Sequence, residues 1–292
     1  MAPLLLKLAL LAVLTSTASG YFSTSFRTWI SATYGESTAV TLERADLGAA
    51  GSFGGGTHNG LSATSKRPIL IVHGITNTAG TFNNQRTYFV NNGWSDETVY
   101  ATTYGDGGVT NVLGVDMECA FVQQVRTMLK IVNAFTQQKV DVIGYSLGSP
   151  IIRKAIMGGN CVDNGVALGD PLTSIVETFV SVAGANRGSS LCALPYLFVD
   201  VCNANNGLWC GSTFLSNINN PSNVHYEGSK VFSIYGFNDD KVGKDNLCFT
   251  GPNSRIPGYD AEMSNAQGNH DQILENYVNV TKVLLDTGAF PV

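Results

Sequence analysis

The sequence has few charged residues, no cluster of basic residues and no internal repeat. Charged side chains make up 13% of its 292 residues and hydrophobic ones 44%, whereas a globular protein usually has roughly 25% charged residues. Disordered chains show the opposite balance, so this chain is expected to fold. The net charge is -5 and no run of Lys or Arg occurs. These features argue against a nucleic acid as partner, because binding one requires positive charge along its phosphates.

Patterns that would indicate a metal or a nucleotide cofactor are also missing. None of the six cysteines forms C-x-x-C or has a histidine at zinc-finger spacing. The glycine-rich stretch 48–60 matches neither G-x-G-x-x-G nor G-x-x-x-x-G-K, so we predict a loop there and no phosphate cradle. We therefore expect no cofactor and no metal in the chemistry of this protein.

The one extended apolar run lies at the N-terminus. Residues 4–14 are apolar except for Lys7, and the small residues Ala18 and Gly20 follow a short polar stretch. Such a run is too short to cross a hydrocarbon core of roughly 30 Å. The pattern predicts a secretory signal peptide over residues 1–20, cut after Gly20, and no transmembrane segment in the mature chain. We expect the protein to be secreted and extracellular.

An even number of cysteines fits export, because disulfides form in oxidising compartments. Six cysteines allow 15 pairings, and the sequence does not choose among them. Four of the six lie between 192 and 248, so this stretch is expected to be stapled; reduced, buried cysteines are the alternative. Asn279-Val280-Thr281 is the single N-glycosylation triplet and agrees with export.

Short apolar runs alternate with helical patterns along most of the chain. The runs rich in branched residues predict buried strands at 69–72, 98–104, 140–143, 179–183 and 231–235. Helical periodicity and flanking residues predict helices at 26–34, 117–135, 149–157 and 273–285. This alternation predicts an α/β fold, a mainly parallel sheet with helices on both faces. Residues 21–292 can form a single domain of this kind.

The only G-x-S-x-G pattern is Gly144-Tyr145-Ser146-Leu147-Gly148, between a predicted strand and a predicted helix. A sharp turn from strand to helix needs small residues at both glycine positions, because a Cβ atom there would clash with neighbouring backbone. The turn presents the serine hydroxyl beside a helix N-terminus. It predicts Ser146 as a nucleophile, the alternative being a loop serine between two glycines.

A serine hydroxyl needs a histidine base that is oriented by a carboxylate, and on this fold the order is serine, acid, histidine. Only His225 and His270 follow Ser146. His225 precedes the strand 231–235, so no acid at the end of a strand would come before it in the order serine, acid, histidine. His270 lies in a loop directly before the last helix and is the predicted base. His73 precedes the serine and ends a buried strand, which favours a structural role.

Two adjacent carboxylates, Asp239 and Asp240, follow the strand 231–235. Adjacent side chains cannot both face one imidazole, and the pattern does not decide between them. Acyl transfer also needs backbone N–H groups for the oxyanion. One is predicted at Leu147, after the nucleophile, and the other in the loop after the strand 69–72, where Gly74 lets the backbone approach.

Taken together, the segments 71–75, 142–148, 179–188 and 233–239 and the loop histidine resemble those of the small secreted class 2 triacylglycerol lipases. These are a branch of the α/β-hydrolase superfamily, and the resemblance covers residues 67–288. It implies the α/β-hydrolase fold and a catalytic triad of Ser146, Asp239 and His270, with Asp240 as second choice for the acid. It also implies oxyanion donors at the backbones of Ile75 and Leu147.

The sequence departs from the smallest members of that family between residues 188 and 228, where it is longer and carries cysteines. The apolar residues of this stretch suit a disulfide-stapled cap, a wall for an acyl chain or a surface that meets a lipid interface. Ordinary packing over the sheet is the alternative.

The leading hypothesis is a secreted serine hydrolase that cleaves lipid esters such as triacylglycerols through an acyl-enzyme. A short-chain carboxylesterase or an acyltransferase would use the same site on other substrates. A non-catalytic binding protein on a hydrolase scaffold is the non-enzymatic alternative, and such proteins usually lack a member of the triad. Candidates for all three members are present here.

Overall fold

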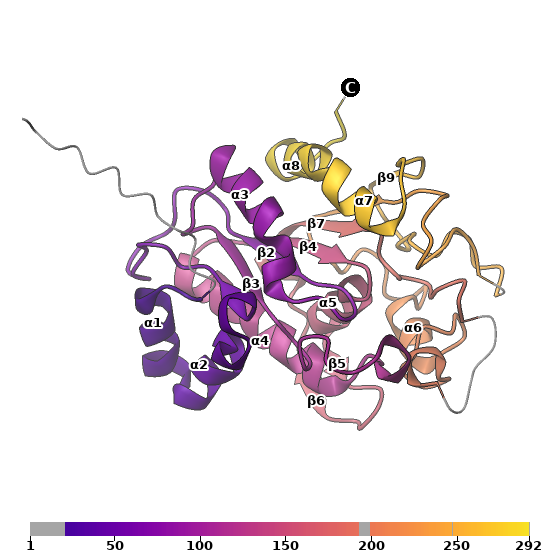
Figure 1. The fold of residues 1–292 in the computed structure, drawn as a ribbon, viewed down its shortest axis with the longest axis horizontal. Helices are drawn as coiled ribbons and strands as arrows, with labels where there is room; N and C mark the ends of the chain where they lie inside the picture. The colour runs from indigo at the N-terminus through magenta and orange to yellow at the C-terminus, as the bar shows by residue number, and fades with distance from the viewer. Residues whose placement is uncertain (1–20, 193–198, 247, 292) are drawn as a thin grey trace, which may run out of the picture.

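The computed structural model describes residues 21–192, 199–246 and 248–291, so the predicted signal peptide over 1–20 lies outside the described residues (Figure 1). A seven-stranded sheet of order β1-β3-β2-β4-β7-β8-β9 forms its centre. The strands are β1 (Ser52–Phe53), β2 (Ile69–Val72), β3 (Val99–Thr102), β4 (Val140–Tyr145), β7 (Val176–Val182), β8 (Lys230–Ile234) and β9 (Ala261–Met263). Within this sheet β1, at one edge, pairs antiparallel and the other described strands pair parallel. A separate two-stranded ribbon joins β5 (Gly159–Asn160) to β6 (Ala167–Gly169).

Helices cover both faces of the sheet, as predicted (Figure 1). Successive residues of a strand point to opposite faces. Leu70 and Val72 accordingly join the core under α4 (Cys119–Thr136) and α5 (Gly148–Met157), while Ile69 and Ile71 join a second core under α3 (Asn83–Asn91) and α8 (Val278–Thr287). This arrangement confirms the predicted mainly parallel α/β architecture. No helix in the described part of the chain is long and apolar enough to cross a membrane.

Several element boundaries differ from the sequence-based expectation. The closing helix predicted at 273–285 is broken at Tyr277 into α7 (His270–Asn276) and α8. The single helix predicted near 26–34 is α1 (Thr24–Tyr34), but a second helix, α2 (Glu36–Glu43), follows it after Gly35. The helices α3 and α6 (Thr213–Ile218) were not predicted. The polar sequence of α3 lacks an apolar stripe, and α6 is too short to show a period.

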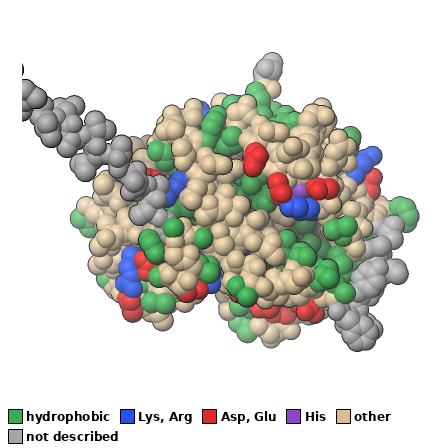
Figure 2. All heavy atoms as spheres, viewed as in Figure 1, with side chains coloured by type: hydrophobic (Ala, Val, Ile, Leu, Met, Phe, Trp, Pro, Cys, Tyr) green, Lys and Arg blue, Asp and Glu red, His purple; other side chains and the backbone are tan. Residues whose placement is uncertain are grey.

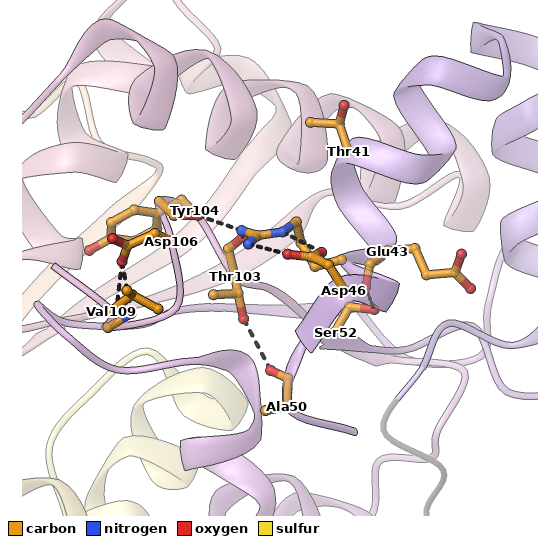
Figure 3. A network of polar contacts seen from close by, with 12 residues as sticks. Thr41, Glu43, Asp46, Ala50, Ser52, Thr103, Tyr104, Asp106 and Val109 are labelled. Atoms are coloured by element: carbon orange, nitrogen blue, oxygen red, sulfur yellow. Dashed lines mark hydrogen bonds and ion pairs between the residues drawn. The ribbon is translucent and has the colours of Figure 1, made fainter. Parts of the chain in front are cut away.

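The N-terminal segment is anchored to the loop that follows β3. The Arg44 guanidinium donates hydrogen bonds to the carbonyl oxygens of Thr103, at 2.8 Å, and Gly105, at 2.5 Å. In the same network the Thr103 hydroxyl donates to the carbonyl oxygen of Ala50 at 3.1 Å (Figure 3). Residues far apart in the sequence thereby hold the start of this loop.

All six cysteines are paired, as predicted from their even number. The disulfides join Cys119 to Cys161, Cys192 to Cys202 and Cys210 to Cys248. The stretch 192–248 therefore holds two of the three bonds. The alternative of reduced cysteines does not apply, because no cysteine is free.

Candidate active site

The serine of the G-x-S-x-G pattern occupies a tight turn between β4 and α5. Ser146 has φ +52°, a left-handed conformation that is uncommon for residues other than glycine. A Cβ atom at Gly148 would lie 2.2 Å from the carbonyl oxygen of His73, and one at Gly144 would lie 2.8 Å from the Cα of Ser149. Both glycines are therefore required by the close approach of neighbouring backbone, which is the geometry of a nucleophile elbow.

A buried carboxylate and a buried imidazole meet beside this turn. Asp239 follows β8, and its Oδ2 lies 2.8 Å from Nδ1 of His270, the first residue of α7. The other oxygen, Oδ1, accepts the backbone N–H groups of Lys241, at 3.0 Å, and Val242, at 2.8 Å. Burial opposes ionisation of Asp239, but the hydrogen bond and charge of His270 and these two N–H groups outweigh it and lower the pKa of the carboxyl. The pair is arranged to hold an ionised acid against a histidine ring.

The neighbouring carboxylate has a different partner. Asp240 Oδ1 accepts the backbone N–H of His270 at 3.0 Å, a position at the N-terminus of α7 where a negative charge is favourable. Of the two adjacent acids that the sequence offered, Asp239 thus contacts the imidazole and Asp240 contacts the main chain.

Ser146 and His270 both line a cavity of about 600 Å³. Ile75 and Leu147 line it too, and neither backbone N–H donates a hydrogen bond within the described residues. Two free donors beside a serine suit an oxyanion, which develops charge only during reaction. Figure 2 shows hydrophobic side chains around a hollow in this face, beside a histidine flanked by acidic and basic side chains.

Much of the remaining lining of the cavity is apolar, besides polar residues such as Thr76, Asn77 and Ser189. We call six of its apolar residues the apolar wall: Val112, Leu113, Leu191, Val199, Val201 and Leu208. The disulfide Cys192–Cys202 also lines the cavity, so the first half of the stretch 188–228 forms part of a pocket. In its second half Phe214 and Leu215 are buried in the core, which is ordinary packing. Of the apolar residues in this stretch, Leu194, Tyr196, Leu197 and Phe198 lie outside the described residues.

Sequence reasoning did not identify two parts of this cavity. Val112 and Leu113 belong to a short 3₁₀ helix, Val112–Gly114, and the sequence carries no signal for them, because so short a segment shows no period. Lys241 and Asp271, each close in sequence to a triad candidate, also line the cavity.

The other histidines near these strands have structural surroundings. His73 is buried and stacks on Tyr104 with 4.0 Å between ring centroids. Its Nε2 accepts the backbone N–H of Tyr104 at 3.0 Å, and its Nδ1 lies 2.8 Å from the carbonyl oxygen of Gly74. Burial lowers the pKa of His73 to about 4, so the ring is neutral. His225 pairs with Asp260 at 3.0 Å and does not line the cavity.

One group of potential metal ligands occurs in the described part of the chain. Cys119, Cys161 and Asp163 lie close enough together to share an ion. The two cysteines form a disulfide, and a sulfur in a disulfide is not the thiolate that binds metals. This group therefore does not fit a metal site.

Comparison with known proteins places the chain in a lipase family. The family described as "Lipase (class 2)" matches residues 66–283. Lipase B of Aspergillus fumigatus superposes with a TM-score of 0.58 at 14% identity, over 83% of this chain and 57% of that one, so the chain spans little more than half of that lipase. The mature lipase BlEst2 of Bacillus licheniformis superposes with a TM-score of 0.56 at 16% identity, over 80% of this chain and 97% of that one. At these identities the superpositions show the fold, and the family match covers most of the chain.

Proposed function

The chain belongs to the class 2 lipase family and has the α/β-hydrolase fold, and on that premise we propose that it is a secreted serine hydrolase that cleaves lipid esters such as triacylglycerols. Hydrolysis of carboxylic esters follows from the family. The serine mechanism, the lipid substrate and the secretion are the proposal.

The observation that carries the mechanism is the buried contact of Asp239 with His270 at the cavity that Ser146 lines. In the proposed reaction the Ser146 hydroxyl attacks the ester carbonyl while His270 takes its proton and Asp239 holds the imidazole. The backbone N–H groups of Ile75 and Leu147 stabilise the oxyanion. His270 then protonates the leaving alcohol, and water hydrolyses the acyl-enzyme with the same base. No metal or cofactor takes part in these steps.

The apolar wall supports a lipid acyl chain as the bound group. A cavity of about 600 Å³ lies within the range of ligand sites that bury apolar molecules. Leu113 and Leu191 at its edge are 57% and 68% exposed, which suits contact with a lipid–water interface. The proposed partner is therefore a lipid ester at such an interface, and the ratio of activity on emulsified triglycerides to that on soluble esters separates this proposal from a short-chain esterase or an acyltransferase.

Secretion is supported by the three disulfides, since such bonds persist in oxidising compartments. The apolar run at residues 4–14, with small residues at Ala18 and Gly20, provides the export signal in this proposal. Sequencing the N-terminus of the protein recovered from culture medium tests it, with Tyr21 expected as the first residue.

Replacement of the nucleophile tests the proposed function directly. Ser146→Ala is expected to lower kcat on a soluble ester by at least about 10⁴-fold without changing the melting temperature by more than a few degrees. Ser222→Ala, in an exposed loop, is the matched control and should keep full activity. A phosphonate ester should label wild-type protein at Ser146, as detected by mass spectrometry. Normal turnover by Ser146→Ala would refute the proposal, and an unreactive serine would favour a binding protein on a hydrolase scaffold.

A further inference from the structure

Three residues next to the triad in sequence meet one another in space. Tyr145 precedes Ser146, Lys241 follows Asp239 by two residues, and Asp271 follows His270. The Tyr145 hydroxyl donates to Asp271 Oδ1 at 2.8 Å. The Lys241 ammonium donates to both oxygens of the same carboxylate, each at 2.8 Å. One carboxylate therefore joins the three segments that carry the candidate nucleophile, acid and base.

Tyr145 also contacts the His270 imidazole directly. The Tyr145 ring is buried and lies with its centroid 5.0 Å from that of His270, tilted by 36°. Phe82 also packs edge-on against the Tyr145 ring, with 5.8 Å between centroids. A ring held at its hydroxyl by Asp271 and at its side by Phe82 restricts how far the neighbouring imidazole can turn.

A role in folding alone does not account for this placement. The side chains of Lys241 and Asp271 are 51% and 61% exposed, and ion pairs so open to solvent contribute little to stability. Both nevertheless line the active-site cavity, where small displacements of reacting groups are costly.

We propose that Tyr145, Lys241 and Asp271 are positioning residues. They link the three segments that carry the triad candidates and fix the orientation of the His270 imidazole relative to Ser146. This inference rests on the proposed function. None of the three is a catalytic residue. Each acts indirectly, by fixing the position of the triad candidate that lies near it in the sequence.

Removal of single atoms or charges tests the link on p-nitrophenyl butyrate, a soluble ester. Tyr145→Phe keeps the ring and should lower kcat about tenfold with KM changed less than twofold. Asp271→Ala should cost about as much, and the double variant no more than Asp271→Ala alone, because both substitutions break one linkage. Two control variants are expected to keep wild-type kcat. Tyr100→Phe removes the hydrogen bond of a tyrosine hydroxyl to the carbonyl oxygen of Glu97, and Lys139→Met breaks the exposed ion pair with Glu177.

The pH profile gives a readout that a merely structural role would not move. Among the described residues, Asp239 and Asp240 contact His270, the titratable Tyr145 packs against its ring, and Asp271, the next residue, binds the Lys241 ammonium. Asp271→Asn removes a negative charge that favours the imidazolium, so the acidic limb of the kcat/KM profile should move to lower pH. Lys241→Met removes the compensating positive charge, so that limb should move to higher pH. Shifts of a fraction of a pH unit are expected, since both side chains are exposed.

The outcomes separate this inference from the proposed function. Three results would overturn the positioning role: unchanged kcat in Tyr145→Phe, additive losses in the double variant, or pH shifts of the same sign in Asp271→Asn and Lys241→Met. The serine mechanism would still stand in that case if Ser146→Ala were inactive. Full turnover by Ser146→Ala would instead overturn the proposed function. If Asp271→Ala does not fold, Tyr145→Phe and the opposite shifts of Asp271→Asn and Lys241→Met still decide.

Discussion

The floor and the wall of the cavity are built in different ways. The floor consists of the turns at the carboxyl ends of β2, β4 and β8, where backbone approaches so closely that a Cβ atom at Gly148 would lie 2.2 Å from the carbonyl oxygen of His73. The apolar wall comes from short segments outside the sheet and the α-helices, and the disulfide Cys192–Cys202 lines the cavity beside it. Its residues Leu113 and Leu191 are more than half exposed.

This difference separates chemistry from specificity. Groups that exchange a proton must be held within tenths of an ångström, which neighbouring parallel strands achieve by their backbone hydrogen bonds. An acyl chain needs only apolar surface of adequate size, and loops provide it. Substitutions in the floor should therefore act mainly on kcat, and substitutions in the wall on KM or on the choice of substrate.

The largest effect is expected at the acid in the floor. Asp239→Asn should lower kcat about 10⁴-fold, because the amide no longer stabilises the imidazolium and favours the wrong tautomer. Asp240→Asn keeps an oxygen for the backbone N–H of His270 and should cost less than about tenfold. Steady-state kinetics on a soluble ester measure both, and a greater loss in Asp240→Asn would show that the acid has been misassigned.

A smaller effect should follow from removing the disulfide Cys192–Cys202 beside the apolar wall. Replacing Cys192 and Cys202 together by serine should lower the free energy of unfolding by roughly 3 kcal/mol, the loop-closure term for such a short loop. It should raise KM for long-chain esters while kcat stays within about twofold. The matched control replaces Cys119 and Cys161, which do not line the cavity; it should lose at least as much stability with KM unchanged. Equal KM values in the two double variants would contradict a role of the staple in the wall.

The floor should also show a specific loss of stability in acid. Because the folded protein holds the pKa of His73 at about 4, against 6.5 ordinarily, the unfolded chain binds a proton more readily between these values. The stabilisation of the folded state by neutral His73 is therefore complete above pH 6.5 and is lost as the pH falls toward 4. The free energy of unfolding should fall by roughly 2 to 3 kcal/mol between pH 7 and 4.5 for this reason. Urea unfolding at the two pH values should show a smaller difference for His73→Gln than for wild type. Equal differences would mean that His73 is not held neutral.

The smallest effect is expected at the edge of the wall. Leu113→Asp and Leu191→Asp should each lower activity on emulsified triglycerides about tenfold, since a charge opposes contact with an apolar surface. Activity on a soluble short ester should change less than twofold. Leu61→Asp is the control, because Leu61 is 81% exposed and does not line the cavity. A loss of the same size in Leu61→Asp would make the effect one of general surface charge.

Local sequence patterns were sufficient for the central strands, and they also provided the candidate nucleophile and base. Branched apolar runs such as 69–72 predict strands because burial and backbone preference act over a few residues. The G-x-S-x-G motif is visible in five consecutive residues, although only one of its glycines is explained locally. Gly144 lies against Ser149, whereas Gly148 lies against the backbone of His73, which follows β2. Chain order then selected His270 over His225, and the structure places His270 and not His225 on the cavity with Ser146.

Tertiary structure decided what depends on contacts between distant segments. The sequence pattern left Asp239 and Asp240 equivalent, and the path of the chain after β8 turns the first toward the imidazole and the second toward the N–H of His270. The pairing of the cysteines, the meeting of Leu113 with Leu191 at one cavity and the contact of Tyr145 with Asp271, 126 residues apart, follow from the order of strands in the sheet. Periodicity and turn chemistry report on neighbours along the chain, so they cannot encode which loops the sheet brings together.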